Sequence, residues 1–225
     1  MIKVLVIGDA CEDIYHYGKC ERLAPEGPAP VFHKLFTERS PGMADNVLTN
    51  LLSLGVQAEL LSQERSIHKI RFIEESTNHL LLREDTDSPS TKSKRIDPET
   101  IGKEYLSQFD AVVVSDYDKG FLSETDLSNI SSNHPVTFLD TKKIVGDWAF
   151  KFSYIKINAQ EYHKLKTARP LLFLDKKSRE YLYGSLIVTK GPEGCYYKKA
   201  NYRVPKVEIR DFAGAGDTFL AGLVC

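Results

Sequence analysis

Residues 209–220 constrain the fold more than any other stretch, because a turn with almost no side chains joins an expected strand to an expected helix. The turn contains Ala213, Gly214, Ala215 and Gly216, and Asp217 opens a helical segment that runs to residue 224. Small residues let a backbone approach a ligand closely, and unpaired N–H groups at a helix N-terminus attract anions. We therefore predict an anion-binding turn beside the carboxylate of Asp217, whose charged form the helix dipole favours. The alternative is an ordinary Gly-rich connection in which Asp217 only complements that dipole.

The composition is typical of a globular protein, with 42% hydrophobic and 27% charged residues in a chain of 225. We expect a single domain over residues 1–225. A net charge of −1 argues against a nucleic-acid partner, and the apolar run at residues 4–7 is too short for a membrane span or a signal peptide. The four cysteines lack metal-ligand spacing, so we expect reduced thiols and a cytoplasmic protein.

Short apolar runs recur along the chain, alternating with helical patterns, and most end in a polar or Gly-containing turn. This rhythm predicts an α/β fold with a doubly wound, mostly parallel sheet. Ligands bind at the carboxyl ends of such strands, so the turns at Gly8, Ser115, Asp140, Asn158 and Gly214 should gather along one edge. The expected strands are residues 4–7, 57–61, 111–114, 136–139, 154–157 and 186–189, and the expected helices are residues 97–108, 123–131 and 171–183, with another ending at residue 54.

A small β excursion is expected at residues 15–36, where two strand-like pieces flank a segment rich in proline. Proline is poorly tolerated in central strands, so these pieces should leave the main sheet. The excursion would act as a lid over a substrate or as a contact in a homodimer, and a long surface loop is the alternative. Two hairpins are also expected, one formed by residues 69–75 and 79–83 and one that turns about residues 200–201.

The string from Asp211 to Phe219, Asp-x-x-Gly-Ala-Gly-Asp-Thr-Phe, closely resembles the signature of the ribokinase-like (PfkB) carbohydrate kinases. The resemblance implies a ribokinase-like fold in which Asp217 takes the proton from a sugar hydroxyl. It also implies that the backbone amides of residues 213–216 form an anion hole for the γ-phosphate of ATP. Phe212 departs from the family, which usually has Thr there.

Further motifs resemble one branch of this family, the D-glycero-β-D-manno-heptose 7-phosphate kinases. The resemblance implies sugar contacts from Asp13, Gly42 and Asn46. Met43 and Asp45 depart from the branch, which has Gly and Ala at those positions; a bulky side chain and a negative charge there would reshape the sugar pocket and repel a sugar phosphate. The matching motifs are Gly8-Asp9, Asp13-x-Tyr15-x-Tyr17-Gly18, Arg22-x-x-Pro25-Glu26-x-Pro28-x-Pro30-Val31 and Pro41-Gly42-x-Ala44-x-Asn46-Val47.

Other motifs suggest where anionic groups bind. Lys119, in a Ser-Asp-Tyr-x-Lys-Gly turn, would face an anion or be an ordinary surface lysine. Asn158-x-x-Glu161 is a capping box on physical grounds, and the resemblance implies that it orders Mg²⁺ and the ATP phosphates, with Glu161 holding the ion through water. The segment containing Thr189, Gly191 and Gly194 resembles the family's nucleotide-binding turn.

Taken together, these features predict an ATP-dependent kinase acting on a sugar or a sugar phosphate, most closely heptose 7-phosphate at its anomeric hydroxyl, with Mg²⁺. Family members continue for several helices beyond the residue that matches Asp217, and they carry an additional helix and strands after the residue that matches Leu61. We therefore expect a C-terminally shortened domain. The alternatives are a catalytically reduced relative that binds sugar or a partner without turnover, and a PfkB kinase for another sugar or a nucleoside.

Overall fold

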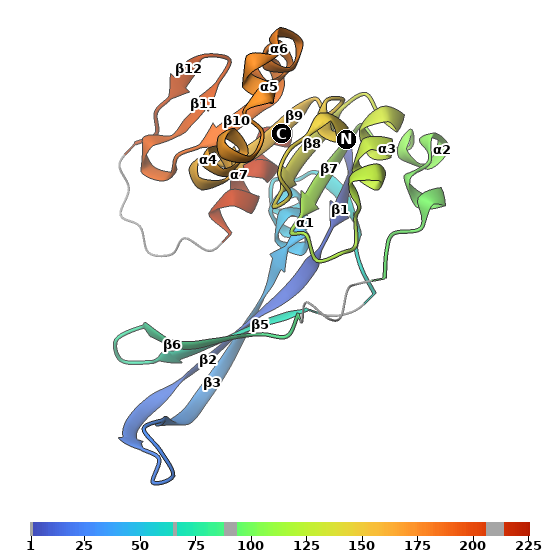
Figure 1. Ribbon diagram of the computed structural model, residues 1–225. Coiled ribbons are helices and arrows are strands. Elements are labelled where there is room, and N and C mark those ends of the chain that lie inside the picture. Colours follow the sequence, from blue (N-terminus) through green and yellow to red (C-terminus); the bar gives the residue numbers. More distant parts are fainter. Residues whose placement is uncertain (1, 65–66, 88–93, 206–213) are drawn as a thin grey trace.

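The computed structural model describes residues 2–64, 67–87, 94–205 and 214–225, which form an α/β body and an outer sheet (Figure 1). The body is built on an eight-stranded sheet in which the six strands from β10 to β4 run parallel, and β11 pairs in antiparallel fashion with both β10 and β12. The predicted mostly parallel sheet is therefore confirmed. In spatial order the strands are β12 (Ala200–Tyr202), β11 (Cys195–Tyr197), β10 (Leu186–Thr189), β9 (Tyr154–Asn158), β8 (Thr137–Thr141), β7 (Ala111–Asp116), β1 (Lys3–Gly8) and β4 (Gln57–Leu61).

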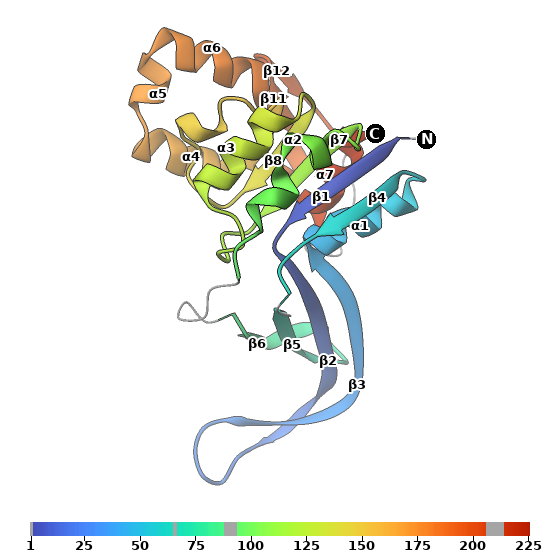
Figure 2. The ribbon, with the colours of Figure 1, turned by 90° about the vertical axis from the view of Figure 1, so that its right-hand side faces the viewer.

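Helices α1 (Ala44–Ser53) and α7 (Ala215–Val224) cover one face of this sheet (Figure 2). Their apolar side chains, among them Val47 and Leu220, pack on Val4 and Val6 of β1 and on the matching side of β7. The two helices also contact each other. This pairing brings the start of α7 next to the start of α1.

The opposite face of the sheet carries the remaining helices, which share one hydrophobic core with Leu5 and Ile7 of β1 and with Val112 and Val114 of β7. Alternate residues of these strands thus enter two different cores, which is why the strands are apolar without interruption. These helices are α2 (Lys103–Leu106), α3 (Glu124–Asn133), α4 (Ala159–Ala168), α5 (Leu171–Leu174) and α6 (Lys176–Ser185), accompanied by the single 3₁₀ turns η1 (Pro98–Ile101), η2 (Asp147–Ala149) and η3 (Gly191–Glu193).

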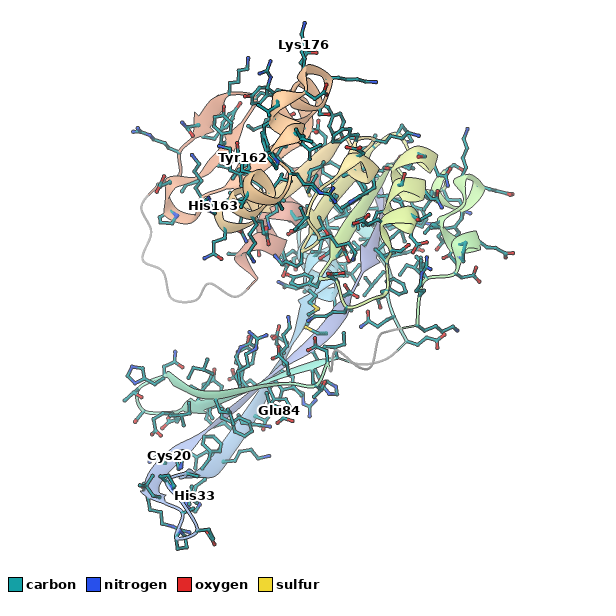
Figure 3. All side chains as sticks on the ribbon, viewed as in Figure 1. Cys20, His33, Glu84, Tyr162, His163 and Lys176 are labelled. Atoms are coloured by element: carbon teal, nitrogen blue, oxygen red, sulfur yellow. The ribbon has the colours of Figure 1, made fainter. Side chains whose placement is uncertain are left out.

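The outer sheet contains four strands in the order β3 (Pro30–Met43), β2 (Ala10–Leu23), β5 (His68–Glu74) and β6 (His79–Asp85). The long β2–β3 hairpin projects away from the body, and Cys20 and His33 lie near its distal end (Figures 1 and 3). Residues 15–36 lie inside this hairpin, whose strands extend to Ala10 and Met43. The predicted hairpin at residues 69–83 joins the same sheet, because β5 pairs in parallel with β2.

Three predicted elements differ in detail from the structure. The helix expected over residues 97–108 is divided at Gly102, whose extended backbone separates η1 from α2. The helix expected over residues 171–183 is divided at Asp175, which follows the last residue of α5. Its side chain caps the start of α6 by accepting a hydrogen bond from Ser178 N. The last hairpin turns at Lys198 and Lys199, both with positive φ, rather than at residues 200–201. Within the described residues, no helix combines the length and the apolar character needed to cross a membrane.

Candidate active site

The carboxyl ends of the parallel strands meet at one edge of the main sheet. Strand register places Gly8 beside Ser115, Ser115 beside Asp140, and Asn158 beside Thr189. Strands β1 and β7 lie so close together at this end that a Cβ on Gly8 would lie 1.9 Å from the carbonyl oxygen of Ser115. Only glycine fits there, so the turn after β1 can approach the turn after β7.

Asp217 lies in the first turn of α7, and Gly214, the N-cap residue just before this helix, has the left-handed conformation at φ 72°. Its carboxylate is buried and accepts two hydrogen bonds from different elements. Asn46 Nδ2 of α1 donates to Oδ2 at 3.0 Å, and the Tyr117 hydroxyl donates to Oδ1 at 2.9 Å. Each carboxylate oxygen can accept more than one bond, so Asp217 is fixed in position and still able to accept another proton donor.

Asn46 is itself oriented by the α1–α7 contact. Asn50 Nδ2 donates to Asn46 Oδ1 at 3.1 Å, and Thr218 Oγ1 donates to Asn50 Oδ1 at 3.2 Å. These bonds leave the Asn46 amide nitrogen directed at Asp217. A Cβ on Gly214 would lie 2.6 Å from that nitrogen, so both the positive φ and the packing require glycine at this turn.

Tyr117 reaches Asp217 from the turn after β7. Buried Asp9 holds this turn, because its Oδ2 accepts bonds from the backbone N–H groups of Tyr117 at 2.8 Å and Lys119 at 3.2 Å. Burial, together with the charge of Asp217, raises the pKa of Tyr117 well above its ordinary value. The hydroxyl therefore stays protonated and serves Asp217 as a donor.

Asp217 borders a cleft of about 800 Å³ at this edge of the sheet. The cleft is lined by many of the residues expected from the sequence, together with several side chains for which the sequence suggested no role. The expected residues in its lining are Asp140, Asn158, Thr189, Gly191, Gly214, Gly216 and Asp217, and the others include Tyr117, Lys142, Lys156 and Glu193.

Lys142, Lys156 and Lys190 line this cleft, and the first two are fixed there by carboxylates. Lys156 of β9 is buried and donates to Asp140 Oδ2 at 2.6 Å, and a Cβ on Gly216 would lie only 2.8 Å from its Nζ. Lys142 donates to Glu161 Oε1 at 2.5 Å and lies 5.3 Å from the centroid of the Tyr117 ring. Burial alone would lower the pKa of Lys142, but the charges of Asp140 and Glu161 outweigh it and raise that pKa, so Lys142 remains a cation.

The capping box at the start of α4 is present, with Glu161 Oε2 accepting from Asn158 N at 2.8 Å and Asn158 Oδ1 accepting from Glu161 N at 2.9 Å. Among the described residues, no three His, Cys, Asp or Glu side chains are grouped closely enough to hold a metal ion. Asp140 Oδ1 is buried without a hydrogen-bond partner in that part of the chain. One free carboxylate oxygen and the nearby Glu161 suit Mg²⁺, which keeps several waters and binds few protein groups directly.

Several expected site residues lie elsewhere or have other partners. Asp13 accepts from Arg71 at 2.6 Å, beside Gly42, where a Cβ would lie 2.3 Å from Asp13 Oδ2. Lys119 is ion-paired with Asp87 rather than free to face an anion. Gly194 packs on the backbone of β12 and does not line the cleft.

The remaining expectations concern the anion turn and the departures from the family. Ala215 begins α7 and is exposed, whereas Ala213 and Phe212 lie outside the described residues. Met43 is buried with φ 58°, a conformation that favours glycine. Asp45 lines a separate cavity of about 670 Å³ and not the cleft of Asp217.

The chain is similar in sequence to a family of carbohydrate kinases and to several curated proteins. Residues 153–225 match the pfkB family carbohydrate kinase model. Bifunctional protein HldE of a Nitratiruptor species is 30% identical over 260 residues, covering 98% of this chain and 56% of the relative. The HldE proteins of Helicobacter acinonychis and Trichlorobacter lovleyi are 27% and 28% identical and are covered over 58% and 55% of their lengths. The chain thus spans a little over half the length of these curated relatives.

The alignment with the Nitratiruptor relative is longer than the 225 residues of this chain, so that relative has insertions inside the matched region. Among solved structures, a phosphofructokinase-2 variant from Escherichia coli superposes with a TM-score of 0.70 over 100% of this chain and 86% of its own, at 14% identity. Ribokinase from Thermotoga maritima gives a TM-score of 0.66 over 100% of this chain and 85% of its own, also at 14% identity. The fold is therefore ribokinase-like.

Proposed function

We propose, because this chain belongs to the pfkB family of carbohydrate kinases, that it transfers the γ-phosphoryl group of ATP to a hydroxyl of a sugar phosphate. The observation that carries the proposal is the environment of Asp217. Its carboxylate is held by Asn46 and Tyr117 at the edge of a cleft that also contains Lys142 and Lys156. A fixed base beside a cationic cleft supplies the positioning and the charge neutralisation that phosphoryl transfer requires.

Asp217 would accept the proton of the attacking hydroxyl as the new oxygen–phosphorus bond forms and the bond between the γ-phosphorus and the bridging oxygen breaks, so that ADP leaves. The two bonds from Asn46 and Tyr117 use donors that stay in place during this step, so the carboxylate need not reorganise. The backbone N–H groups of residues 214–216 begin α7 and would face the transferring phosphoryl oxygens. This arrangement supports the anion hole expected from the sequence as far as its described residues go.

The donor nucleotide would occupy the cleft between α4 and α7. Lys142 and Lys156 would stabilise negative charge on its phosphates, and Thr189 and Gly191 would line the part of the cleft that it occupies. Asp140 and Glu161 are the carboxylates that would hold Mg²⁺, and the bound ion would neutralise charge on the nucleotide phosphates. Lys142 would then exchange part of its interaction with Glu161 for a phosphate oxygen.

The acceptor that we propose is heptose 7-phosphate, phosphorylated at its anomeric hydroxyl, because the motifs of the N-terminal half resemble those of the heptose 7-phosphate kinases. Asn46 would orient the sugar next to Asp217, and Asp13 and Gly42 lie on the same side, at the base of the outer sheet. All four cysteines are free thiols in the structure, which suits a cytoplasmic enzyme.

The outer sheet would cover the acceptor or contact a second copy of the chain. Its β6 strand exposes Leu80 and Leu82, at 56% and 59% of their surface, along an unpaired sheet edge. Exposed apolar edges of this kind favour association with another strand. We therefore propose a homodimer formed through the outer sheet, which sedimentation velocity of wild type and of Leu82→Glu would test.

The activity is tested by incubating the protein with γ-labelled ATP, Mg²⁺ and a panel of sugars, hexose phosphates and heptose 7-phosphate. We expect weak but measurable transfer to a sugar phosphate by wild type and none by Asp217→Asn. If wild type binds a sugar phosphate in calorimetry yet transfers no label, the protein is instead a catalytically reduced relative. Equal transfer by both proteins would remove Asp217 from the mechanism.

A further inference from the structure

The base of the outer sheet carries several charged side chains on one face. Lys69 and Arg71 are two residues apart on β5 and therefore point to the same side of the sheet. In the β5–β6 pairing Lys69 lies opposite Asp85, and Arg71 lies opposite Arg83. Two arginines directly opposite each other repel, so the face needs negative charge to balance it.

Three of the four cations in this region have a carboxylate partner. Arg71 pairs with Asp13 at 2.6 Å, and Arg83 makes two bonds to Asp85 at 2.7 and 2.8 Å. The third pair joins Lys119 to Asp87. Each of the nearby carboxylates is therefore already used by a cation other than Lys69.

Lys69 is half-buried, and no carboxylate of the described residues lies within ion-pair distance of it. Its neighbours are the thiol of Cys11 and the ring of Tyr117, whose centroid lies 5.1 Å from Nζ. Burial raises the pKa of Cys11 to about 11, so the thiol stays neutral and cannot balance the ammonium charge. Lys69 is thus a cation held near the site without a counter-ion in the described chain.

The position of Lys69 relates it to the acceptor rather than to the nucleotide. The Tyr117 ring that it contacts donates to Asp217, so one aromatic side chain separates Lys69 from the proposed base. Lys142 contacts the same ring but lines the nucleotide cleft, and Lys69 does not. Lys69 also belongs to the outer sheet, in register with Asp13 of β2.

We infer that Lys69, with Arg71 beside it, binds the phosphate group of a phosphorylated acceptor. A lysine ammonium is a compact charge that donates up to three hydrogen bonds, and Arg71 has N–H groups beyond the one bonded to Asp13. A phosphate monoester would supply the negative charge that this face lacks. The acceptor class is therefore a sugar monophosphate, and Lys69 takes the role that the sequence suggested for Lys119. This inference rests on the proposed kinase function.

The test compares wild type with Lys69→Met, which keeps the length of the side chain and removes its charge. Lys34→Met is the matched control, because Lys34 is exposed on β3 of the same sheet. We expect Lys69→Met to raise KM for the sugar phosphate by about tenfold to a hundredfold, the effect of a lost charged hydrogen bond. The inhibition constant of inorganic phosphate, measured in competition with the sugar phosphate, should rise by about the same factor. KM for ATP and all constants of Lys34→Met should stay at the wild-type values, and Lys69→Arg should restore most of the loss.

Calorimetric binding of the sugar phosphate to the unreacted protein gives a second measurement, independent of turnover. An unchanged dissociation constant in Lys69→Met would overturn the inference, as would an equal rise in KM for ATP. A wild-type protein that binds the sugar phosphate through Lys69 but transfers no phosphoryl group would defeat the kinase proposal and leave the binding site standing.

Discussion

The buried pair of Lys156 and Asp140 gives the sharpest quantitative prediction. The two side chains are only 5% and 4% exposed, and Nζ lies 2.6 Å from Oδ2. Removing one partner of such a pair leaves an uncompensated buried charge and typically costs about 3–5 kcal/mol. Asp140 Oδ1 already lacks a partner in the described chain, so Lys156→Met leaves the whole carboxylate without a donor. We expect Lys156→Met to lower the free energy of unfolding by about 3–5 kcal/mol.

The double variant Asp140→Asn with Lys156→Met removes both charges and should recover part of this loss. An unsatisfied buried amide costs about 1–3 kcal/mol, so the double variant should be about 2 kcal/mol more stable than Lys156→Met alone. The surface pair of Lys94 with Glu64 is the control. Its side chains are 77% and 81% exposed, and Lys94→Met should cost less than about 1 kcal/mol.

Urea unfolding followed by circular dichroism measures these differences, provided that the slope of the transition stays constant among the variants. The double variant should regain stability without regaining phosphoryl transfer, because both charges line the cleft. The reasoning is refuted if Lys156→Met is as stable as Lys94→Met, or if the double variant is the least stable of the set.

Two further predictions concern residues around Asp217. Tyr117→Phe removes the 2.9 Å bond to Asp217 and should lower kcat about tenfold with KM for ATP unchanged, as steady-state kinetics would show; a rise in KM for ATP with kcat intact would contradict this. Met43→Gly and Met43→Ala remove nearly the same buried side chain, but at φ 58° only glycine is unstrained. Thermal unfolding should therefore find Met43→Gly more stable than Met43→Ala by about 1–3 kcal/mol. Greater stability of Met43→Ala would mean that the backbone there is not strained.

The sequence predicted the parts of the fold that follow from local patterns. Uninterrupted apolar runs located the central strands, and because parallel strands end at one edge, they also placed Asp140, Asn158 and Gly214 near one another. Small residues before Asp217 indicated a helix start, and α7 begins there. These predictions held because each depends on neighbouring residues or on a general rule of sheet topology.

The sequence did not reveal interactions that depend on strand register or on distant loops. Lys156 alternates with apolar residues in β9, and only the sheet pairing shows that it is buried against Asp140, 16 positions earlier. The motif around Lys119 suggested an anion-binding residue, and only the structure shows that Asp87, in the loop after β6, is its ion-pair partner. Tyr117 belongs to a recognisable turn, but its bond spans 100 positions to Asp217. A polar residue within a strand or in the turn after one was the available signal in each case, and it does not identify the partner.

The most direct test of the account is single-turnover transfer from γ-labelled ATP to heptose 7-phosphate by wild type and by Asp217→Asn, at a temperature where both are folded. Loss of a general base typically slows a reaction by about a hundredfold or more. We predict a loss of at least that size in Asp217→Asn, with ATP affinity unchanged. Transfer at the wild-type rate would show that the carboxylate held by Asn46 and Tyr117 does not serve as the base.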